Sequence, residues 1–356
     1  MTRAGIGSRL LHDAQNRGVT AWLLSAAFTA FYIALYFTES LTPLATALGL
    51  SGKWDLYGIL YTAAVVGGGM YVLRKYGHNR YQVVRTWVVM FVQVVFAFAI
   101  PHILRALHQP EYYLSYFWPL KFEYFTPGYL FAQPVAFIVY TIAGSFVLVP
   151  LLAALFGKRW YCSWVCGCGG LANTFGEPWR HLSSKTSVAW KFEKVAIHSV
   201  LGVCLLLTAL LFLSHGRARQ LPELTQVVNR FQTIYGFVVL SVLSGVVGVG
   251  LYPIGGTRVW CRFFCPMAAL LGLVQKAGRY RIEVKQDMCI SCGLCSKYCE
   301  MGIDVRSYAQ AGESFTRASC VGCGMCAEVC PRGVLTLENV SVRAPQETVL
   351  IQIQGV

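Results

Sequence analysis

Residues 234–267 read IYGFVVLSVLSGVVGVGLYPIGGTRVWCRFFCPM and join an apolar run to a pair of cysteines. The run 234–254 is long and apolar enough to cross a membrane as a helix. A basic residue, an aromatic residue and then Cys261-x-x-x-Cys265 follow it. Ninety-nine residues earlier, KRWYCSWVCG (158–167) places Cys162 and Cys166 behind another apolar run in the same way. This pattern predicts a membrane protein with an internal repeat of helix, basic-aromatic turn and cysteine pair.

The composition argues against a soluble domain of this size. Of the 356 residues, 56% are hydrophobic and 13% are charged, which is typical of a polytopic membrane protein. The chain is too long and apolar for a disulfide-rich secreted scaffold. Ten of its 14 cysteines lie within 261–330, and such clustering indicates metal ligation. The formal charge of +14 comes from residues that flank the apolar runs, so it indicates membrane topology rather than nucleic-acid binding.

Six apolar runs are expected to form transmembrane helices, at about 20–37, 57–73, 86–104, 134–156, 195–213 and 234–254. The first two are slightly short for a span, and the second carries three glycines at 67–69, so the sequence defines its ends poorly. No small-residue cleavage pattern follows the first run, so we interpret it as an anchor rather than a signal peptide.

Basic residues predict the orientation of the spans. They concentrate in the N-terminal segment and after the second, fourth and sixth runs, among them Arg74, Arg85, Lys158, Arg180 and Arg258. With six spans these segments share one side, and the positive-inside rule makes that side cytoplasmic. Arg217, Arg219 and Arg230 on the opposite side weaken the asymmetry. We therefore expect a protein of the cytoplasmic (inner) membrane with both termini in the cytoplasm.

From Ile282 onward, two cysteine runs dominate the sequence. CISCGLCSKYC (289–299) and CVGCGMCAEVCP (320–331) each place three cysteines three residues apart and a fourth one slightly further on. In bacterial ferredoxins the first three bind one [4Fe–4S] cluster and the fourth binds the other cluster. We therefore expect one cluster on Cys289, Cys292, Cys295 and Cys330, and another on Cys320, Cys323, Cys326 and Cys299. Structural zinc and disulfides are the alternatives, but zinc sites usually separate two cysteine pairs by a longer spacer, and disulfides need an oxidising compartment.

These motifs divide the chain into three parts. We expect a transmembrane domain at 1–281 with its repeat at 134–180 and 234–276, a double ferredoxin-like α+β domain at 282–340, and a tail at 341–356. A domain as small as 282–340 buries too little apolar surface to be comfortably stable alone, so bound clusters must stabilise its fold. The end of the tail, TVLIQIQGV (348–356), alternates like a strand.

Two local details accompany the cysteine runs. Gly293, Gly322 and Gly324 should let backbone amides approach the sulfurs. The runs also differ at one position, because Glu300 follows Cys299 whereas Pro331 follows Cys330. We expect this difference to change the local turn, and not the number of ligands.

The membrane cysteine pairs predict a third metal centre. Aligning 157–159 with 256–258 brings Cys162 over Cys261 and Cys166 over Cys265. Two such helices packed about a pseudo-twofold axis would bring four thiolates together, and an iron–sulfur cluster is our leading interpretation. A redox-active dithiol, a copper or zinc site, and cysteines that merely pack remain open. Thiolates near an apolar region need a compensating cation, and Arg159 and Arg258 are placed to supply part of it.

Two further cysteines need separate interpretations. Cys168 is an alternative to Cys166 as the fourth ligand of the membrane centre, although the repeat favours Cys166. Cys204 lies in the middle of the fifth span and is expected to pack as a small apolar residue.

The combination of two membrane C-x3-C(P) motifs with a double ferredoxin domain resembles the membrane polyferredoxins of the NapH, NosR and CcoG kind. The resemblance covers roughly 134–338, and Cys261–Pro266 keeps the C-x3-CP form. The first copy departs from it, with Gly167 in place of proline and the additional Cys168. We find no segment before the first span that is large enough for the flavin-binding domain of NosR-like proteins. The resemblance implies electron transfer between a quinol pool or cytoplasmic donor and a partner redox protein.

Other residues are weaker candidates. His102 and His198 are candidate quinone-binding or proton-relay residues, because ionisable groups in membranes are often functional. His102 and His215 can alternatively form a haem pair. The aromatic-rich segment YYLSYFWPLKFEYFTPGYLF (112–131) is typical of an interfacial belt in a re-entrant turn, and a docking surface or quinone-site wall is the alternative.

We therefore expect a polytopic α-helical membrane protein with a C-terminal double [4Fe–4S] domain that serves as an electron-transfer subunit of a membrane oxidoreductase complex. A metal (copper) reductase or assembly factor of the CcoG-like type is the alternative, and a structural anchor of a larger redox complex is another. The expected partners are other membrane or peripheral redox subunits and the lipid bilayer, without nucleic acid. We expect two [4Fe–4S] clusters, a third centre and possible use of a quinone.

Overall fold

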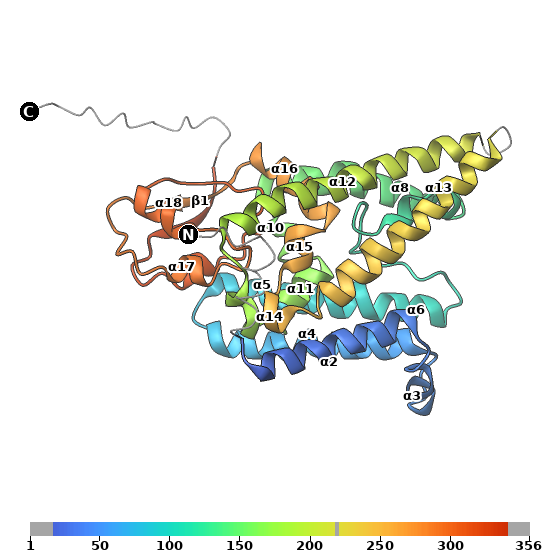
Figure 1. Cartoon of the computed structure of the whole chain (residues 1–356), viewed down its shortest axis with the longest axis horizontal. Coiled ribbons are helices and arrows are strands. Elements are labelled where there is room, and N and C mark those ends of the chain that lie inside the picture. Colours follow the sequence, from blue (N-terminus) through green and yellow to red (C-terminus); the bar gives the residue numbers. More distant parts are fainter. Residues whose placement is uncertain (1–16, 218–220, 341–356) are drawn as a thin grey trace, which may run out of the picture.

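The chain folds into a bundle of long helices with a small domain at one end. A computed structural model describes residues 17–217 and 221–340. In Figure 1 the long helices run side by side, and the C-terminal domain, in red, lies beyond one end of them. The predicted strand at 348–356 lies outside the described residues.

Six helical segments of the described chain are long and apolar enough to cross a membrane, as the sequence predicts. Many large apolar side chains on their outer faces are exposed, as lipid-facing residues would be. The six are α2 (Val19–Phe37), α4 (Lys53–Tyr76), α5 (Arg80–Val92) with η1 (Gln93–Ala99) and α6 (Ile100–Ala106), α8 (Val135–Ala143) with η3 (Gly144–Leu148) and α9 (Val149–Phe156), α12 (Ser187–Gly216), and α13 (Pro222–Tyr235) with η5 (Gly236–Val247).

Several spans differ from their predicted bounds. The third begins at Arg80 and the fifth at Ser187, because polar first turns that the hydropathy pattern left out continue both helices. The sixth ends at Val247 rather than 254, since the chain turns there into the short helix α14 (Tyr252–Gly255).

The three glycines at 67–69 do not break α4, which is continuous from Lys53 to Tyr76. They are a packing surface instead. A Cβ at Gly68 would lie 2.3 Å from the backbone nitrogen of Phe175, and one at Gly69 would lie 2.4 Å from Sδ of Met90. The close approach of the 167–182 connection to α4 therefore requires Gly68. Gly69 leaves room for the Met90 side chain of α5, whereas a Cβ at Gly67 would meet nothing within 4 Å.

Short helices connect the spans. Those that build the candidate sites are α10 (Arg159–Cys162), α11 (Gly167–Asn173) and η4 (Glu177–Leu182) between the fourth and fifth spans, and α15 (Val259–Phe263) and α16 (Pro266–Lys276) after the sixth. The others are α3 (Thr42–Ala47), η2 (Phe122–Phe125) and α7 (Pro127–Leu130).

The aromatic segment 112–131 packs into the helix bundle. Phe117, Trp118, Phe122 and Tyr124 are buried, and the Trp118 indole donates a hydrogen bond to Oγ1 of Thr208 in α12. These contacts contradict a purely interfacial belt for this segment, because the bundle covers its central aromatic side chains.

The C-terminal domain is closed by a two-stranded antiparallel sheet. Strand β1 (Tyr280–Val284) pairs with β2 (Leu335–Asn339), with Ile282 opposite Leu337. Between the strands lie the short helices α17 (Leu294–Lys297), α18 (Val305–Ala311) and α19 (Met325–Glu328). Buried apolar side chains, among them Ile282, Val305, Phe315 and Leu335, form its small core.

Side chains of the transmembrane domain hold the loop 320–323 of the C-terminal domain. Four consecutive backbone carbonyls accept hydrogen bonds from these side chains. Gln275 donates to the carbonyl of residue 320 (3.0 Å), Ser163 to that of residue 321 (2.7 Å) and Tyr81 to that of residue 322 (2.7 Å). The carbonyl of residue 323 accepts from both Gln82 (3.0 Å) and Arg85 (2.6 Å). Since each buried carbonyl needs a partner, this loop depends on the helices for its hydrogen bonding.

Candidate metal centres

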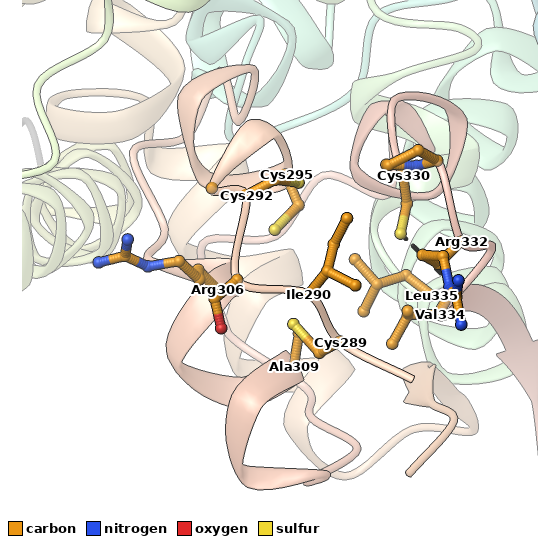
Figure 2. Close-up of a pocket in the computed structure, with 13 residues that line it drawn as sticks. Cys289, Ile290, Cys292, Cys295, Arg306, Ala309, Cys330, Arg332, Val334 and Leu335 are labelled. Carbon is orange, nitrogen blue, oxygen red and sulfur yellow. Dashed lines mark hydrogen bonds between the residues drawn. The ribbon is translucent and has the colours of Figure 1, made fainter. Parts of the chain in front are cut away.

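Two pockets in the C-terminal domain each gather four cysteines. One is lined by Cys289, Cys292, Cys295 and Cys330, and we name it the outer cysteine site. The other is lined by Cys299, Cys320, Cys323 and Cys326, and we name it the inner cysteine site. These are the two sets expected from the spacing, including the exchange of the fourth cysteine between runs. Figure 2 shows Cys292 and Cys295 approaching the outer site from one side and Cys330 from the other.

Backbone geometry supports anionic sulfur at both sites. Gly293, Gly322 and Gly324 all adopt positive φ angles, at 77°, 59° and 78°, which the sequence predicts for turns that bring amides inward. The amide of Val334 donates to Sγ of Cys330 at 3.4 Å. Such donors stabilise thiolate ligands and tune the potential of a bound cluster.

The inner site is the more enclosed of the two. Burial raises the pKa of the Cys299 and Cys323 thiols to about 11, whereas Cys292 of the outer site is exposed. Thiolates in such a setting are costly unless a cation compensates them. A cluster supplies that compensation, and the ligand count and enclosure of both sites fit one.

The two membrane cysteine pairs lie on matching pieces of backbone. Gly157 and Gly256, with φ angles of 74° and 86°, end α9 and α14. The short helices α10 and α15 follow, and Cys166 and Cys265 then stand as the N-terminal caps of α11 and α16. The predicted repeat is therefore present in the backbone conformation as well as in the sequence.

These pairs converge in one buried region. Cys162, Cys166, Cys261 and Cys265 are all buried in the same core, and we name them the membrane cysteine site. Burial raises the pKa of Cys162 and Cys261 to about 11, and Cys261 interacts electrostatically with both cysteines of the other pair. The arrangement offers four sulfur ligands at the end of the bundle that faces the C-terminal domain.

The cations beside this site differ in part from the expected ones. Arg258 does lie there, with its Nη1 3.8 Å from Sγ of Cys261 and 3.2 Å from the carbonyl oxygen of Cys162. Arg159 does not, since its guanidinium stacks on the Tyr280 ring at 4.8 Å and donates to Asn339. Lys158, one residue earlier, is buried and faces Cys162 instead. The turn after Gly157 therefore directs the side chain of Lys158, and not that of Arg159, toward the membrane cysteine site.

Packing explains why the first copy has Gly167 where the second has Pro266. A Cβ at Gly167 would lie 2.2 Å from the Tyr116 hydroxyl, so a larger residue would require the Tyr116 side chain to move. The Tyr61 hydroxyl also donates to the Gly167 carbonyl at 2.8 Å. Cys168 follows directly and interacts electrostatically with the Cys166 thiol, so it is a neighbour of the membrane cysteine site. The choice between Cys166 and Cys168 as ligand stays a prediction.

Glu300, the residue at which the two cysteine runs differ, is the centre of a buried charge network. Its Oε1 lies 2.9 Å from Nη2 of Arg258, and its Oε2 lies 3.2 Å from Nη1 of Arg180. Arg180 also pairs with Glu177 at 2.7 Å. All four side chains are at most 1% exposed. Burial alone raises the pKa of a carboxyl group, but the two guanidinium groups outweigh it and lower that of Glu300 to about 2.

Arg85 belongs to the same region and corrects a prediction. We expected it in a loop as a topology signal, but it lies in α5 and is 1% exposed. Arg85 and Arg180 both interact electrostatically with Cys323 of the inner site. Within the described chain, Nε and Nη2 of Arg85 and Nη2 of Arg180 are buried without a hydrogen-bond partner. A buried guanidinium N–H group without a hydrogen-bond acceptor destabilises the fold. An anionic cluster at the inner site would accept hydrogen bonds from these groups.

The three histidines singled out in the sequence lie apart from the cysteine sites or at their margin. His102 is near Asp55, with Nε2 3.5 Å from Oδ1, and His215 packs on the Phe131 ring. His198 shares a pocket wall with Cys261. A quinone or relay role for His102 and His198 stays a prediction.

The geometry of the cysteines also bears on the two alternatives to clusters, which are disulfides and single metal ions. All 14 cysteines are free, with no disulfide among them. In the part of the chain that the structure describes, no three His, Cys, Asp or Glu side chains are grouped tightly enough for a single metal ion. The ligands of a cubane, by contrast, each bind a different iron atom around a larger group.

Comparisons with known families agree with this geometry. Residues 282–337 match the family model of a 4Fe-4S dicluster domain. Residues 137–186 and 235–285 each match the model of a 4Fe-4S binding domain, so one model covers both membrane cysteine pairs. Together with the six spans, these matches support the predicted resemblance to the membrane polyferredoxins.

The chain is similar to curated proteins along part of its length. It is 27% identical over 179 residues to the "Putative electron transport protein YccM" of Escherichia coli, which covers 47% of each chain. It is 29% identical over 155 residues to the "Methylamine utilization ferredoxin-type protein MauN" of Methylobacillus flagellatus, covering 43% of this chain and 52% of that protein. Identity to the "Regulatory protein NosR" of Pseudomonas aeruginosa is 27%, over 51% of this chain and 24% of that one.

The chain therefore spans between about a quarter and a half of the length of these three relatives. No solved structure matches it. The iron–sulfur character of the chain thus rests on its family matches and on its cysteine sites.

Proposed function

We propose that this protein is the electron-transfer subunit of a membrane oxidoreductase complex. Clusters bound at its cysteine sites would supply one-electron chemistry. The observation that carries the proposal is the direct connection between the inner and membrane cysteine sites. Glu300 follows Cys299 of the inner site, its carboxylate contacts Arg258, and Arg258 contacts Cys261 of the membrane site. A continuous, buried and hydrogen-bonded path suits electron transfer between fixed sites.

The outer cysteine site is suited to exchange with a partner that is not embedded in the bundle. Cys292 is exposed, and Arg306 and Arg332, which are also exposed, line the same pocket. Cations beside an exposed redox site favour partners with acidic surfaces. The membrane cysteine site lies at the end of the spans, and a quinol or a membrane-bound redox protein is our proposed partner there.

A redox titration of the purified protein tests this function. We expect the inner site to have a higher reduction potential than the outer one, because Arg85 and Arg180 favour the form with the additional electron. Arg85→Gln should lower the inner potential by about 60 mV, equivalent to a tenfold change in a one-electron equilibrium. Arg306→Gln, beside the outer site, is the matched control and should leave the inner potential unchanged.

The same titration, followed by electron paramagnetic resonance, separates the candidate functions. Reduction of all sites by a quinol supports the proposed electron transfer with a quinone partner. Sites that stay in one oxidation state at every accessible potential would support a structural anchor instead.

One observation favours a second candidate, metal handling by a copper reductase or assembly factor. Cys168 adds a fifth thiol that interacts electrostatically with Cys166 of the membrane cysteine site. Soft thiolates suit copper(I), although the sulfurs would have to move closer together to hold a single ion. Copper bound in place of iron at Cys162, Cys166, Cys261 and Cys265 would favour this function.

We further propose that the protein lies in the cytoplasmic membrane with its C-terminal domain in the cytoplasm. The basic residues after the second, fourth and sixth spans support this orientation through the positive-inside rule. A reporter that is active only in the cytoplasm, fused after Val356, should be active. Activity of a periplasm-specific reporter at the same position would reverse the orientation.

A further inference from the structure

A second kind of pocket, apart from the two cysteine-lined ones, lies between α12, α16 and the C-terminal domain. Its volume is about 250 Å³. One acidic side chain, Glu193, lines it. Five basic side chains also line it: Lys158, Lys194, Arg262, Lys276 and Arg317. We name it the cationic pocket. Such an excess of positive charge around a concave site is unusual unless an anion occupies it.

The carboxylate of Glu193 is already engaged. It lies 2.7 Å from Nε of Arg262. Among the described residues, Lys158, Lys194, Lys276 and Arg317 make no ion pair with a carboxylate. The cationic pocket therefore keeps a net positive charge that its own acidic residue does not neutralise.

Lys158 is the deepest of these cations. It is 1% exposed, and the one hydrogen bond of its ammonium group is a long one, 3.4 Å, to the carbonyl oxygen of Ala268. Anionic ligands at Cys162 and Cys320, which it also faces, would balance part of this charge. The three cations further out, Lys194, Lys276 and Arg317, do not have that compensation.

An indole ring fixes two of the outer cations. Nζ of Lys194 lies 3.7 Å from the centre of the Trp190 ring, and the guanidinium of Arg317 lies 5.0 Å from it. Cation–π contacts of this kind hold long side chains in place. One nitrogen of Arg317, Nη1, also donates to the Tyr308 hydroxyl at 2.8 Å, and its other donors remain for a ligand. Trp190 also lies in the first turn of a span, where tryptophan marks the boundary between lipid and water.

Exposed apolar side chains follow directly in the chain on residues that line the cationic pocket. Val195 of α12 follows Lys194 and is 68% exposed, and Leu273 of α16 follows Gly272 and is 43% exposed. A ligand here would meet cations at one end and lipid-facing side chains at the other. Basic pockets between transmembrane helices have this form when they bind anionic lipid headgroups.

We propose that the cationic pocket binds a phosphate group, and that an anionic phospholipid of the surrounding bilayer supplies it. The phosphate accepts hydrogen bonds from Lys194, Lys276 and Arg317, and the acyl chains lie along Val195 and Leu273. The bound lipid then contacts α12, α16 and the C-terminal domain together, and so ties that domain to the membrane surface.

Native mass spectrometry of the detergent-purified holoprotein tests the proposal, with phosphatidylglycerol as the probe. We expect one lipid to be retained at low lipid concentration, and phosphatidylcholine not to replace it. The double variant Lys194→Gln/Arg317→Gln should bind it at least tenfold more weakly. Lys276→Gln is a second variant that should weaken binding on its own, so the test does not depend on one substitution.

Lys191→Gln is the matched control, because Lys191 is exposed on the same helix but does not line the pocket. It should retain the lipid as the wild type does. Equal losses in Lys191→Gln and the double variant would indicate general surface charge and overturn the proposal. Displacement of the lipid by millimolar inorganic phosphate would show a soluble source of the phosphate, and would overturn the assignment to a lipid.

Discussion

Glu300→Gln is expected to destabilise the attachment of the C-terminal domain by about 3–5 kcal/mol, the usual cost of removing one partner from a buried ion pair. The substitution leaves the guanidinium groups of Arg258 and Arg180, both at most 1% exposed, without their shared carboxylate. Small domains have only about 5–15 kcal/mol of stability in total. We therefore expect partial loss of the native domain and of iron from the inner cysteine site.

Denaturant unfolding followed through the visible absorbance of the clusters measures this effect. Glu313→Gln is the matched control, since Glu313 is exposed in the same domain and its replacement should leave the transition unchanged. The double variant Glu300→Gln/Arg258→Gln should recover part of the loss, because it removes one of the unpaired charges. A transition for Glu300→Gln that coincides with that of the wild type would show that the network contributes nothing to the attachment.

Cys261→Ala is expected to remove a complete metal centre without affecting the C-terminal domain. If the membrane cysteine site holds a cubane, the wild type carries about twelve iron atoms per chain and the variant about eight. Cys292→Ser should instead reduce the iron of the outer site and destabilise the C-terminal domain. Iron and acid-labile sulfide, measured per chain on protein purified without oxygen, distinguish the two losses.

Cys204→Ser is the control for this series. Cys204 is a buried thiol of α12 outside the three cysteine sites, so its replacement should leave the iron content at the wild-type value. A wild type with only about eight iron atoms, and no change in Cys261→Ala, would exclude a cluster at the membrane cysteine site.

The sequence alone predicts which cysteines of the C-terminal domain group together, because their grouping depends on spacing within short loops. A spacing of three residues places sulfur atoms around one cluster whatever surrounds the loop, and the positive φ angles at Gly293 and Gly324 follow from the same spacing. The six spans were accessible for a similar reason, since each needs only a run of apolar residues. The ends of the spans were harder to predict, because hydropathy does not register the polar first turns of α5 and α12. The side chains of Asn79 and Thr186 cap these turns.

The buried charges could not be predicted in this way. Arg85, Arg180 and Arg258 look like the flanking basic residues of any membrane protein, and a sequence shows a charge but not its partner. Their partners, Cys323 and Glu300, lie far along the chain in another domain. The glutamate after Cys299 was the one visible signal, because it stands where the second run has proline. The sequence also favoured Arg159 as the cation beside Cys162, whereas Lys158 lies there. The fold sets the direction in which each side chain leaves the turn after Gly157.

The hydrogen bonds to carbonyls 320–323 have a consequence for the modular history of this protein. Ferredoxin domains are commonly regarded as cassettes that evolution moves between proteins intact. Here Gln275, Ser163, Tyr81, Gln82 and Arg85 each donate to the loop. A transplanted ferredoxin would have to present the same four carbonyls at the same positions, together with an acidic residue opposite Arg258 and Arg180. The two halves of the molecule are therefore constrained to change together, as the two sides of an obligate interface are.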